Sequence, residues 1–207
     1  MTSSETFVHR FLPGSGPEGP VLLLLHGTGG DENDLIPLGQ ALLPGAALLS
    51  LRGKVLENGM PRFFRRLAEG VFDLHDLRRR TNELAAFLLN FRTEKGLTTN
   101  RLVAVGYSNG ANIAVSLLLS HPFSLSGAVL FRAMVPFRPQ STPNLHAIPI
   151  FLSAGRRDPI VGPENTLELT QMLQEAGADV SLNWHRGGHE LGADEIKAAG
   201  EWLFGQV

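Results

Sequence analysis

The stretch LVAVGYSNG, residues 102–110, joins a short apolar run to a serine that lies between two glycines. The apolar run is continuous, which is typical of a strand buried on both faces of a parallel sheet. Residues 109–120 continue with small and apolar side chains and predict a helix. Gly106-x-Ser108-x-Gly110 between such elements is the pattern of a nucleophile elbow, a strained turn that lifts the serine hydroxyl above the sheet. Ser108 is therefore the candidate nucleophile.

Two glycines around a serine also occur by chance, so the alternative is an ordinary strand-to-helix turn in which the serine caps the helix. The surrounding residues favour the elbow. Glycines two positions before and after the serine reduce crowding where the strand and the helix nearly touch. Ala111 and Ala114 would let the same helix pack close to the strand.

The rest of the chain alternates strand-length apolar runs with longer amphipathic stretches. Further strands are predicted at residues 6–11, 21–27, 46–51, 127–131, 149–154 and 180–185, and further helices at residues 34–43, 73–91, 164–176 and 193–204. This alternation predicts an α/β protein with a mostly parallel sheet flanked by helices. No linker interrupts it, so we expect one domain over residues 1–207 without a separate lid domain. Residues 53–72 are expected to be irregular.

Composition excludes several classes of protein. A formal net charge of −2 offers no basic surface for a nucleic acid, and the absence of cysteine excludes disulfides, thiolate metal sites and a cysteine nucleophile. The longest apolar run, residues 21–25, is far too short to cross a bilayer. The first residues lack the pattern of a signal peptide. We therefore expect a cytoplasmic protein with no nucleic-acid or membrane partner, and we leave a homodimer open.

A serine nucleophile needs a base, and the base needs an acceptor that orients it. In α/β proteins with an elbow, the chain order is serine, acid, histidine. Asp158 follows the predicted strand 149–154, at the carboxyl end where such sheets build their sites, and Pro159 disfavours a helix there. The alternative is an aspartate that only shapes a turn or caps a helix. Asp158 is the candidate acid.

Two histidines follow Asp158. His189 comes after Gly187 and Gly188, on a loop that can reach back over the sheet, so it is the candidate base. His185 ends the last predicted strand and is expected to pack on the sheet or face solvent. The spacing of the two histidines also suggests a zinc site, but the glycines oppose a helix and no glutamate lies between the pair. No metal is expected.

Acyl transfer also requires hydrogen-bond donors for a tetrahedral oxyanion. One donor would be the backbone N–H of Asn109, the residue after the serine, and another would come from the loop after an early strand. That loop is HGTGGDE, residues 26–32, and Thr28 is the candidate for the second donor. A glycine-rich turn without a catalytic part is the alternative. A phosphate loop is disfavoured because neither phosphate-binding glycine motif is present.

These segments resemble the phospholipase/carboxylesterase family of α/β-hydrolases, which includes acyl-protein thioesterases and small bacterial carboxylesterases. The likeness covers nearly the whole chain and rests on LLLLHGTGGDENDL near the start, GYSNGANIA at the elbow, FLSAGRRDPIV and GGHEL. It implies the α/β-hydrolase fold and no metal or organic cofactor. It also implies that Ser108 is the nucleophile, His189 the base and Asp158 the acid. Thr28 and Asn109 would be the two backbone donors to the oxyanion. Asn109 departs from the glutamine usual in acyl-protein thioesterases, which weakens that assignment.

Two segments that leave the sheet on the side of Ser108 are candidates for a substrate pocket. The apolar side chains proposed to line it are Met60, Phe63, Phe64, Phe72 and Met134. They would suit an apolar acyl or aryl group, and a core beneath a long loop is an equally good interpretation. Arg156 and Arg157 could favour an anionic substrate, but we expect them to be ordinary exposed basic residues.

The sequence thus predicts a serine carboxylesterase that hydrolyses small carboxylic esters through an acyl-enzyme intermediate. One alternative is a thioesterase or a lysophospholipase-type hydrolase. Another is a non-enzymatic ligand-binding protein of the same fold. Acyl chain length and physiological substrate are not specified by these residues.

Overall fold

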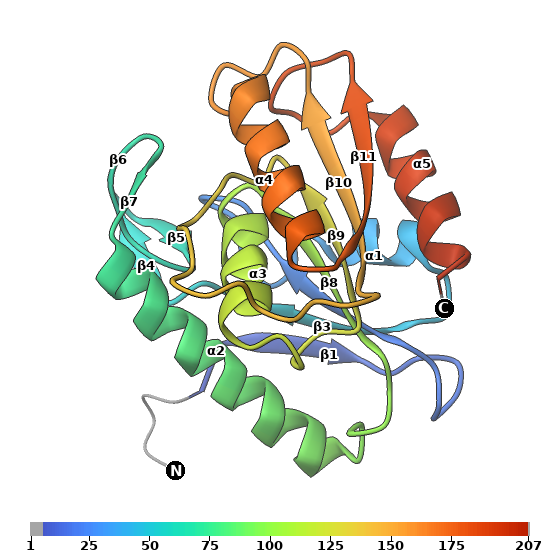
Figure 1. Ribbon diagram of the computed structural model, residues 1–207. Coiled ribbons are helices and arrows are strands. Elements are labelled where there is room, and N and C mark those ends of the chain that lie inside the picture. Colours follow the sequence, from blue (N-terminus) through green and yellow to red (C-terminus); the bar gives the residue numbers. More distant parts are fainter. Residues whose placement is uncertain (1–5, 207) are drawn as a thin grey trace.

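The computed structural model describes residues 6–206 and is built around a seven-stranded sheet (Figure 1). In sheet order the strands are β1 (His9–Leu12), β3 (Ala47–Leu51), β2 (Val21–Leu25), β8 (Leu102–Tyr107), β9 (Gly127–Phe131), β10 (Pro149–Gly155) and β11 (Asp179–His185). Neighbouring strands pair in parallel, except that β1 runs antiparallel to β3 at one edge. The predicted fold class, a mostly parallel sheet flanked by helices, is confirmed.

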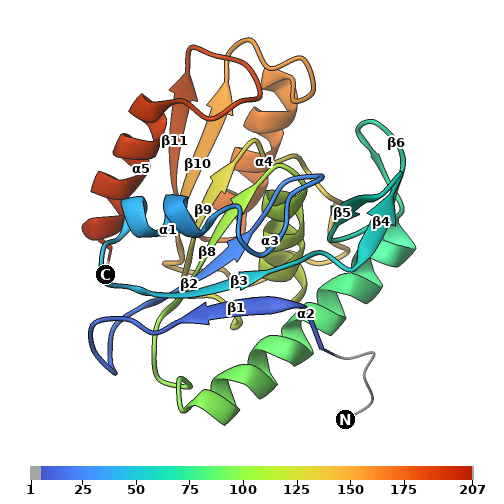
Figure 2. The same cartoon turned by 180° about the vertical axis from the view of Figure 1, so that it is seen from behind.

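Helices cover both faces of this sheet. One face carries α2 (Leu74–Lys95), α3 (Asn109–Ser120) and α4 (Pro163–Glu175), and the other carries α1 (Ile36–Leu42) and α5 (Ala193–Phe204) (Figure 1, Figure 2). The start of α2 follows from its N-cap, because the Asp73 carboxylate accepts the Asp76 N–H at 3.0 Å. The helix runs beyond the predicted end at residue 91 and stops at Gly96, whose φ is 68°. Within residues 6–206, no helix has the length and apolarity needed to cross a membrane.

The central strands are buried along their whole length, which explains their continuous apolar runs. On β2, Leu23 and Leu25 pack with side chains of α2 and α3, whereas Leu22 and Leu24 pack with side chains of α1 and α5. All four leucines have no solvent-exposed surface. Because β8 to β11 are parallel neighbours, their carboxyl ends meet at one edge of the sheet, where three of the predicted site residues follow them.

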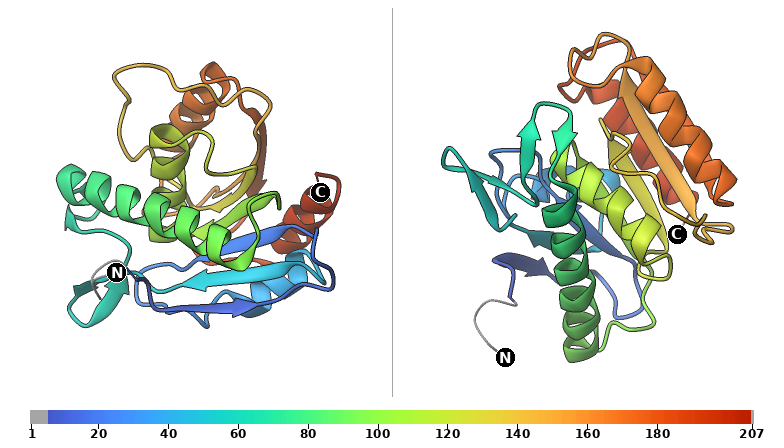
Figure 3. Two further views of the ribbon diagram at one scale, coloured as in Figure 1. Left: turned by 90° about the horizontal axis from the view of Figure 1, so that it is seen from below. Right: turned by 60° about the vertical axis from the view of Figure 1, so that its left-hand side comes forward.

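The sequence analysis expected residues 53–72 to be irregular, and this expectation is wrong. The segment forms two short hairpins. One pairs β4 (Val55–Glu57) with β5 (Met60–Arg62), and the other pairs β6 (Arg66–Ala68) with β7 (Val71–Phe72). The first turn is Asn58-Gly59, with φ of 52° and 80°, a sequence that favours tight hairpins. Strands this short carry no alternating pattern, so the turn was the usable signal. Both hairpins project from the body near the start of α2 (Figure 3).

Candidate active site

The turn between β8 and α3 holds Ser108 in an unusual backbone conformation, with φ 51° and ψ −113°. Residues other than glycine rarely adopt this combination of φ and ψ, and such backbone strain costs about 1–3 kcal/mol. The two glycines of the motif permit it. A Cβ on Gly106 would lie 2.6 Å from the Ala111 Cα, and a Cβ on Gly110 would lie 2.0 Å from the Leu25 carbonyl oxygen. Only glycine fits at either position, because Gly106 lies against the first turn of α3 and Gly110 lies against the end of the neighbouring strand β2.

Three predicted residues form one hydrogen-bonded chain above the ends of β8, β10 and β11. His189 Nε2 lies 3.0 Å from Ser108 Oγ, and His189 Nδ1 lies 2.8 Å from Asp158 Oδ2. The other carboxylate oxygen of Asp158 accepts the N–H groups of Ile160 and Val161 at 2.8 and 3.1 Å. With Asp158 as acceptor, the imidazole proton lies on Nδ1 and Nε2 is free to accept the Ser108 hydroxyl.

The loops that carry the acid and the histidine lie in direct contact. A Cβ on Gly155, the last residue of β10, would lie 2.1 Å from the Gly188 carbonyl oxygen. The Arg157 N–H donates to the Gly187 carbonyl at 3.0 Å. Glycine at these positions lets the loops meet. His185 lies away from the cavity that Ser108 and His189 line, with Nδ1 3.1 Å from an Asp194 carboxylate oxygen, as expected for the histidine not chosen as base.

Arg132 is an important residue that the sequence analysis missed. It directly follows β9, has a φ of 58°, and is only 1% exposed. Its Nε donates to the Gly188 carbonyl at 2.9 Å, and its Nη2 donates to the Glu190 carbonyl at 2.7 Å. The Tyr107 hydroxyl donates to the His189 carbonyl between them at 3.1 Å. The backbone is thus held at His189 and on both sides of it.

Glu195, in the first turn of α5, completes this buried network. Its carboxylate accepts Arg132 Nη2 at 2.6 Å, Arg132 Nη1 at 2.7 Å and Ser153 Oγ at 2.5 Å, and it also accepts the Gly192 N–H at 2.8 Å. Burial alone would raise the pKa of Glu195, but these hydrogen bonds outweigh it and hold that pKa below its ordinary value. Arg132 could have been suspected, because it follows an apolar strand as Asp158 does. Glu195 gave no comparable signal.

The two predicted oxyanion donors lie on the wall of the same cavity as Ser108. Within residues 6–206, no acceptor is paired with the backbone N–H of Thr28 or of Asn109. Their side chains are anchored instead, because Thr28 Oγ1 accepts Arg62 Nη1 at 2.5 Å and Asn109 Oδ1 accepts the Phe63 N–H at 2.7 Å. The geometry leaves both N–H groups available for a ligand.

His26, the first residue of the loop 26–32, is a buried structural histidine. Its Nδ1 donates to the Gly27 carbonyl at 2.6 Å, and its Nε2 accepts the Gly53 N–H at 2.9 Å. Burial lowers the pKa of His26, so the ring is neutral. This pair of bonds fixes the loop 26–32 to the beginning of the segment that forms the two hairpins, residues 53–72.

The cavity above Ser108 and His189 has a volume of about 290 Å³. Of the side chains predicted to line it, Phe72 and Met134 do so. Phe63 and Phe64 do not: they are 1% and 0% exposed and belong to the core. Met60 lies outside the cavity and is 40% exposed. Phe63 and Phe64 are buried because the chain turns into the core after β5. The polar side chains of Arg62, Arg66 and Glu69 line the cavity in their place.

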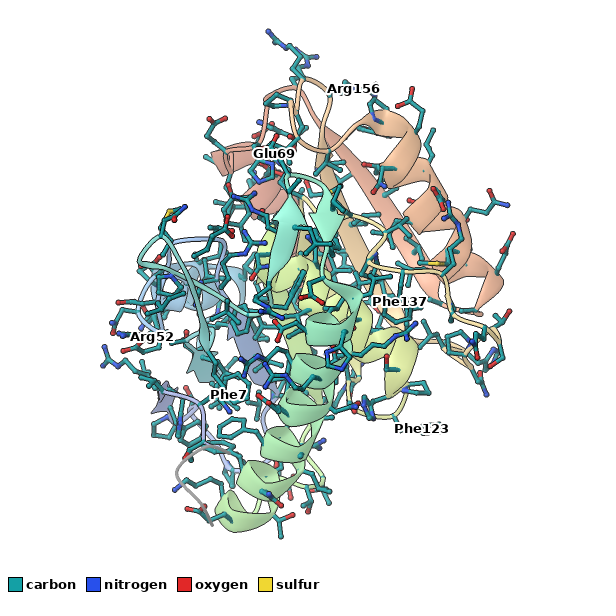
Figure 4. The ribbon with its side chains drawn as sticks, turned by 90° about the vertical axis from the view of Figure 1, so that its left-hand side faces the viewer. Phe7, Arg52, Glu69, Phe123, Phe137 and Arg156 are labelled. Atoms are coloured by element: carbon teal, nitrogen blue, oxygen red, sulfur yellow. The ribbon has the colours of Figure 1, made fainter. Side chains whose placement is uncertain are left out.

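Other predicted features of the site can be located as well. Arg156 and Arg157 are exposed and do not line the cavity, and Arg156 stacks over Trp184 at 5.3 Å. Figure 4 shows Arg156 on the loop after β10. In the part of the chain that the structure describes, no group of three or more histidine or acidic side chains could hold a metal ion.

A mostly parallel sheet, an elbow after a central strand, and a serine, histidine and aspartate joined above its carboxyl edge define the class of this protein as an α/β-hydrolase. The chain belongs to the phospholipase/carboxylesterase family, whose model matches residues 11–204. Membership makes it a hydrolytic enzyme of the esterase type.

Individual relatives agree with this membership. The chain is 49% identical to the protein MhqD of Bacillus subtilis strain 168 over 187 residues, which cover 90% of this chain and 94% of that protein. The crystal structure of the Bacillus cereus carboxylesterase is 48% identical, with a TM-score of 0.95 and coverage of 97% of this chain and 95% of that one. The structure of YahD with malic acid is 30% identical, with a TM-score of 0.92 over 98% and 100% of the two chains.

Proposed function

We propose that this protein is a serine carboxylesterase that hydrolyses small carboxylic esters through an acyl-enzyme intermediate. The observation that carries the proposal is the hydrogen-bonded chain from Ser108 through His189 to the buried carboxylate of Asp158. A hydroxyl needs such a base to become a nucleophile at neutral pH, and a binding protein has no need of the three groups together.

The reaction follows from these positions. His189 Nε2 takes the hydroxyl proton while Ser108 Oγ attacks the ester carbonyl, and the unpaired N–H groups of Thr28 and Asn109 donate to the oxyanion. His189 then gives its proton to the departing alcohol, which leaves an acyl group on Ser108. Water attacks this acyl-enzyme with His189 again as base, and the carboxylic acid departs. Asp158 holds the imidazole in the tautomer that accepts at Nε2.

The size of the cavity supports a small substrate. Its volume of about 290 Å³ lies at the low end for small-molecule sites, and its apolar side chains are Phe72, Met134 and Ile160. A short acyl or aryl group fits this space better than a long lipid chain does. Because the relative YahD has a structure with malic acid, esters that carry a carboxylate belong in a substrate panel.

The first alternative is a thioesterase or lysophospholipase-type hydrolase, which would use the same residues on another substrate. The second is a ligand-binding protein without turnover. A panel of aryl esters of increasing acyl length, with a thioester beside them, separates these possibilities. The cytoplasmic location stays a prediction from the sequence, and a homodimer stays open.

The decisive experiment is hydrolysis of short aryl esters by Ser108→Ala. We expect kcat to fall by on the order of 10⁶-fold, because the variant lacks the nucleophile. Ser120→Ala, at the exposed end of the same helix α3, is the matched control and should retain activity. A fluorophosphonate probe should label the wild type and the control but not Ser108→Ala. Ester turnover by Ser108→Ala at the wild-type rate would refute the proposal.

A further inference from the structure

Two arginines on the wall of the cavity share a single carboxylate. Arg62 Nε lies 3.1 Å from a Glu57 oxygen, and Arg66 Nε donates to the two Glu57 oxygens at 2.9 and 3.2 Å. Both arginines line the cavity that Ser108 and His189 line, whereas Glu57 does not. Burial, and after it the charge of Arg66, lowers the pKa of Arg62. Since two guanidinium groups share the single carboxylate of Glu57, the two arginines carry one positive charge more than Glu57 balances.

Arg66 has hydrogen-bonding capacity that the protein leaves unused. Only its Nε is bound, and across residues 6–206 no acceptor is paired with its two terminal nitrogens. The side chain is 28% exposed, so the free end of the guanidinium is accessible from the cavity. A guanidinium presents its N–H groups as a planar fork that matches a carboxylate in two parallel hydrogen bonds.

The second arginine connects this charge to the reacting centre. Arg62 Nη1 donates to the side chain of Thr28, whose backbone N–H is one of the unpaired donors beside Ser108. Only the Thr28 side chain thus separates the guanidinium of Arg62 from the place proposed for the ester carbonyl. Apolar side chains of Phe72, Met134 and Ile160 complete the wall.

One acidic residue also lines the cavity and must be weighed against the arginines. Glu69 lies at the tip of the β6–β7 hairpin (Figure 4) and is exposed. Because water and salt screen exposed charges more strongly than buried ones, its repulsion of an anion is weaker than the attraction of Arg62, which is 3% exposed. Because Glu57 and Glu69 together balance the two arginines, an anion would be held by the free terminal N–H groups of Arg66 and not by a net positive charge.

We propose that this site is selective for esters that carry a carboxylate a few bonds from the reacting carbonyl, and that Arg66 binds this carboxylate. The inference rests on the proposed esterase function and adds a substrate class to it. Arg66 is a specificity-determining residue here, and Arg62 supports it while also anchoring Thr28.

Two matched pairs of substrates test the proposal. The first pair is 4-acetoxybenzoate and 4-acetoxybenzamide, which differ by a charge on the leaving group. The second pair is phenyl hydrogen glutarate and its amide, which differ by a charge on the acyl group. In at least one pair, kcat/KM of the wild type should favour the carboxylate by about tenfold, the scale of a charged hydrogen bond. The pair that responds identifies which side of the ester faces Arg66.

Two variants of adjacent arginines assign the effect. Arg66→Gln should reduce the carboxylate-to-amide ratio to about one, because the fork is lost. Arg65→Gln is the matched control, since Arg65 is 61% exposed, pairs with Asp73 and does not line the cavity. It should keep the wild-type ratio. Inhibition of the wild type by 4-hydroxybenzoate compared with 4-hydroxybenzamide repeats the test without a variant, and the carboxylate should inhibit more strongly.

The outcomes separate this inference from the proposed function. If the wild type hydrolyses all four esters without favouring either carboxylate, selectivity for an anion is wrong while the esterase proposal stands. An unchanged ratio in Arg66→Gln would likewise exclude Arg66 as the binding residue. If the wild type hydrolyses none of the esters, including the neutral ones, the proposed function itself fails.

Discussion

The side of the cavity formed by the loops after β9, β10 and β11 is held by buried ionic hydrogen bonds, whereas the side formed by the two hairpins is partly exposed. Arg132 and Glu195 have fully buried side chains at 2.6 Å from each other. Arg66 and Glu57 form an ion pair of similar length, 2.9 Å, but both side chains are 28% exposed. The two pairs look alike in chemistry and differ in environment.

This difference separates two tasks. Removing one member of a buried ion pair costs far more than removing one member of an exposed pair, because the remaining charge cannot return to water. The buried pair fixes the backbone around His189, where small displacements would break the hydrogen bond to Ser108. The Arg66–Glu57 pair borders solvent, and the terminal N–H groups of Arg66 stay free beside it. The backbone is fixed on one side of the cavity, and the other side is the one proposed to bind the substrate's carboxylate.

The largest effect is expected from His189, and His185 at the end of β11 is its control. His189→Ala should lower kcat on a short aryl ester by on the order of 10⁶-fold, because the proposed base is removed. His185→Ala, four positions earlier and bonded to Asp194, should change kcat little. Steady-state kinetics of the two variants checks this. Equal losses from both would mean that the proposed base has been misassigned.

The next effect compares the two arginine pairs directly. Arg132→Met should lower the free energy of unfolding by about 3–5 kcal/mol, because Glu195 would remain buried without its partner. Arg66→Gln should lower it by less than about 1 kcal/mol, as for an exposed pair. Denaturant unfolding of both variants measures this contrast. Similar losses from the two would mean that the Arg132–Glu195 pair contributes no more to stability than the Arg66–Glu57 pair does.

A double variant separates stability from positioning. Replacing the whole pair, as Arg132→Met with Glu195→Leu, should recover most of the lost stability, because an apolar pair of similar volume can replace a buried ion pair. Its kcat should stay low, since the Gly188 and Glu190 carbonyls are no longer held beside His189. Recovery of kcat together with stability would show that Arg132 acts only on the fold.

The smallest effect is a pH dependence at the base of the hairpin side. His26 is neutral when folded because burial lowers its pKa, whereas the unfolded chain takes up a proton below the ordinary value of 6.5. Protons then favour the unfolded state, so the free energy of unfolding should fall as pH drops from 6.5. His26→Gln can keep one donor and one acceptor without titrating. The decline between pH 6.5 and about 5 should be steeper in the wild type than in this variant.

Local patterns made most of the fold predictable. The elbow at Ser108 could be found because its strand, turn and helix are consecutive. Gly106 is required by a contact five residues away, at Ala111, whereas the contact that requires Gly110 comes from the distant Leu25. The chain-order rule selected Asp158 and His189 from distant segments, and the structure brings both to Ser108. Their catalytic roles stay predictions until the variants are measured.

Interactions between distant segments were not predictable. Arg132 and Glu195 are 63 residues apart, and neither lies in a motif. Phe63 and Phe64 were assigned to the pocket because aromatic residues beside a site suit either a pocket or a core, and only tertiary packing decides between the two. The arginines beside them were overlooked for the same reason, since the direction of a short strand such as β5 or β6 depends on what it packs against.

The dependence of the histidine loop on Glu195 has a consequence for the order in which activity arises. As the chain is synthesised from its N-terminus, the strands that carry Ser108 and Asp158 emerge first. The carboxylate that locks the histidine loop belongs to α5, the helix that follows all of them in the chain. We therefore expect the histidine loop to be locked only after α5 has been synthesised and has packed on the sheet.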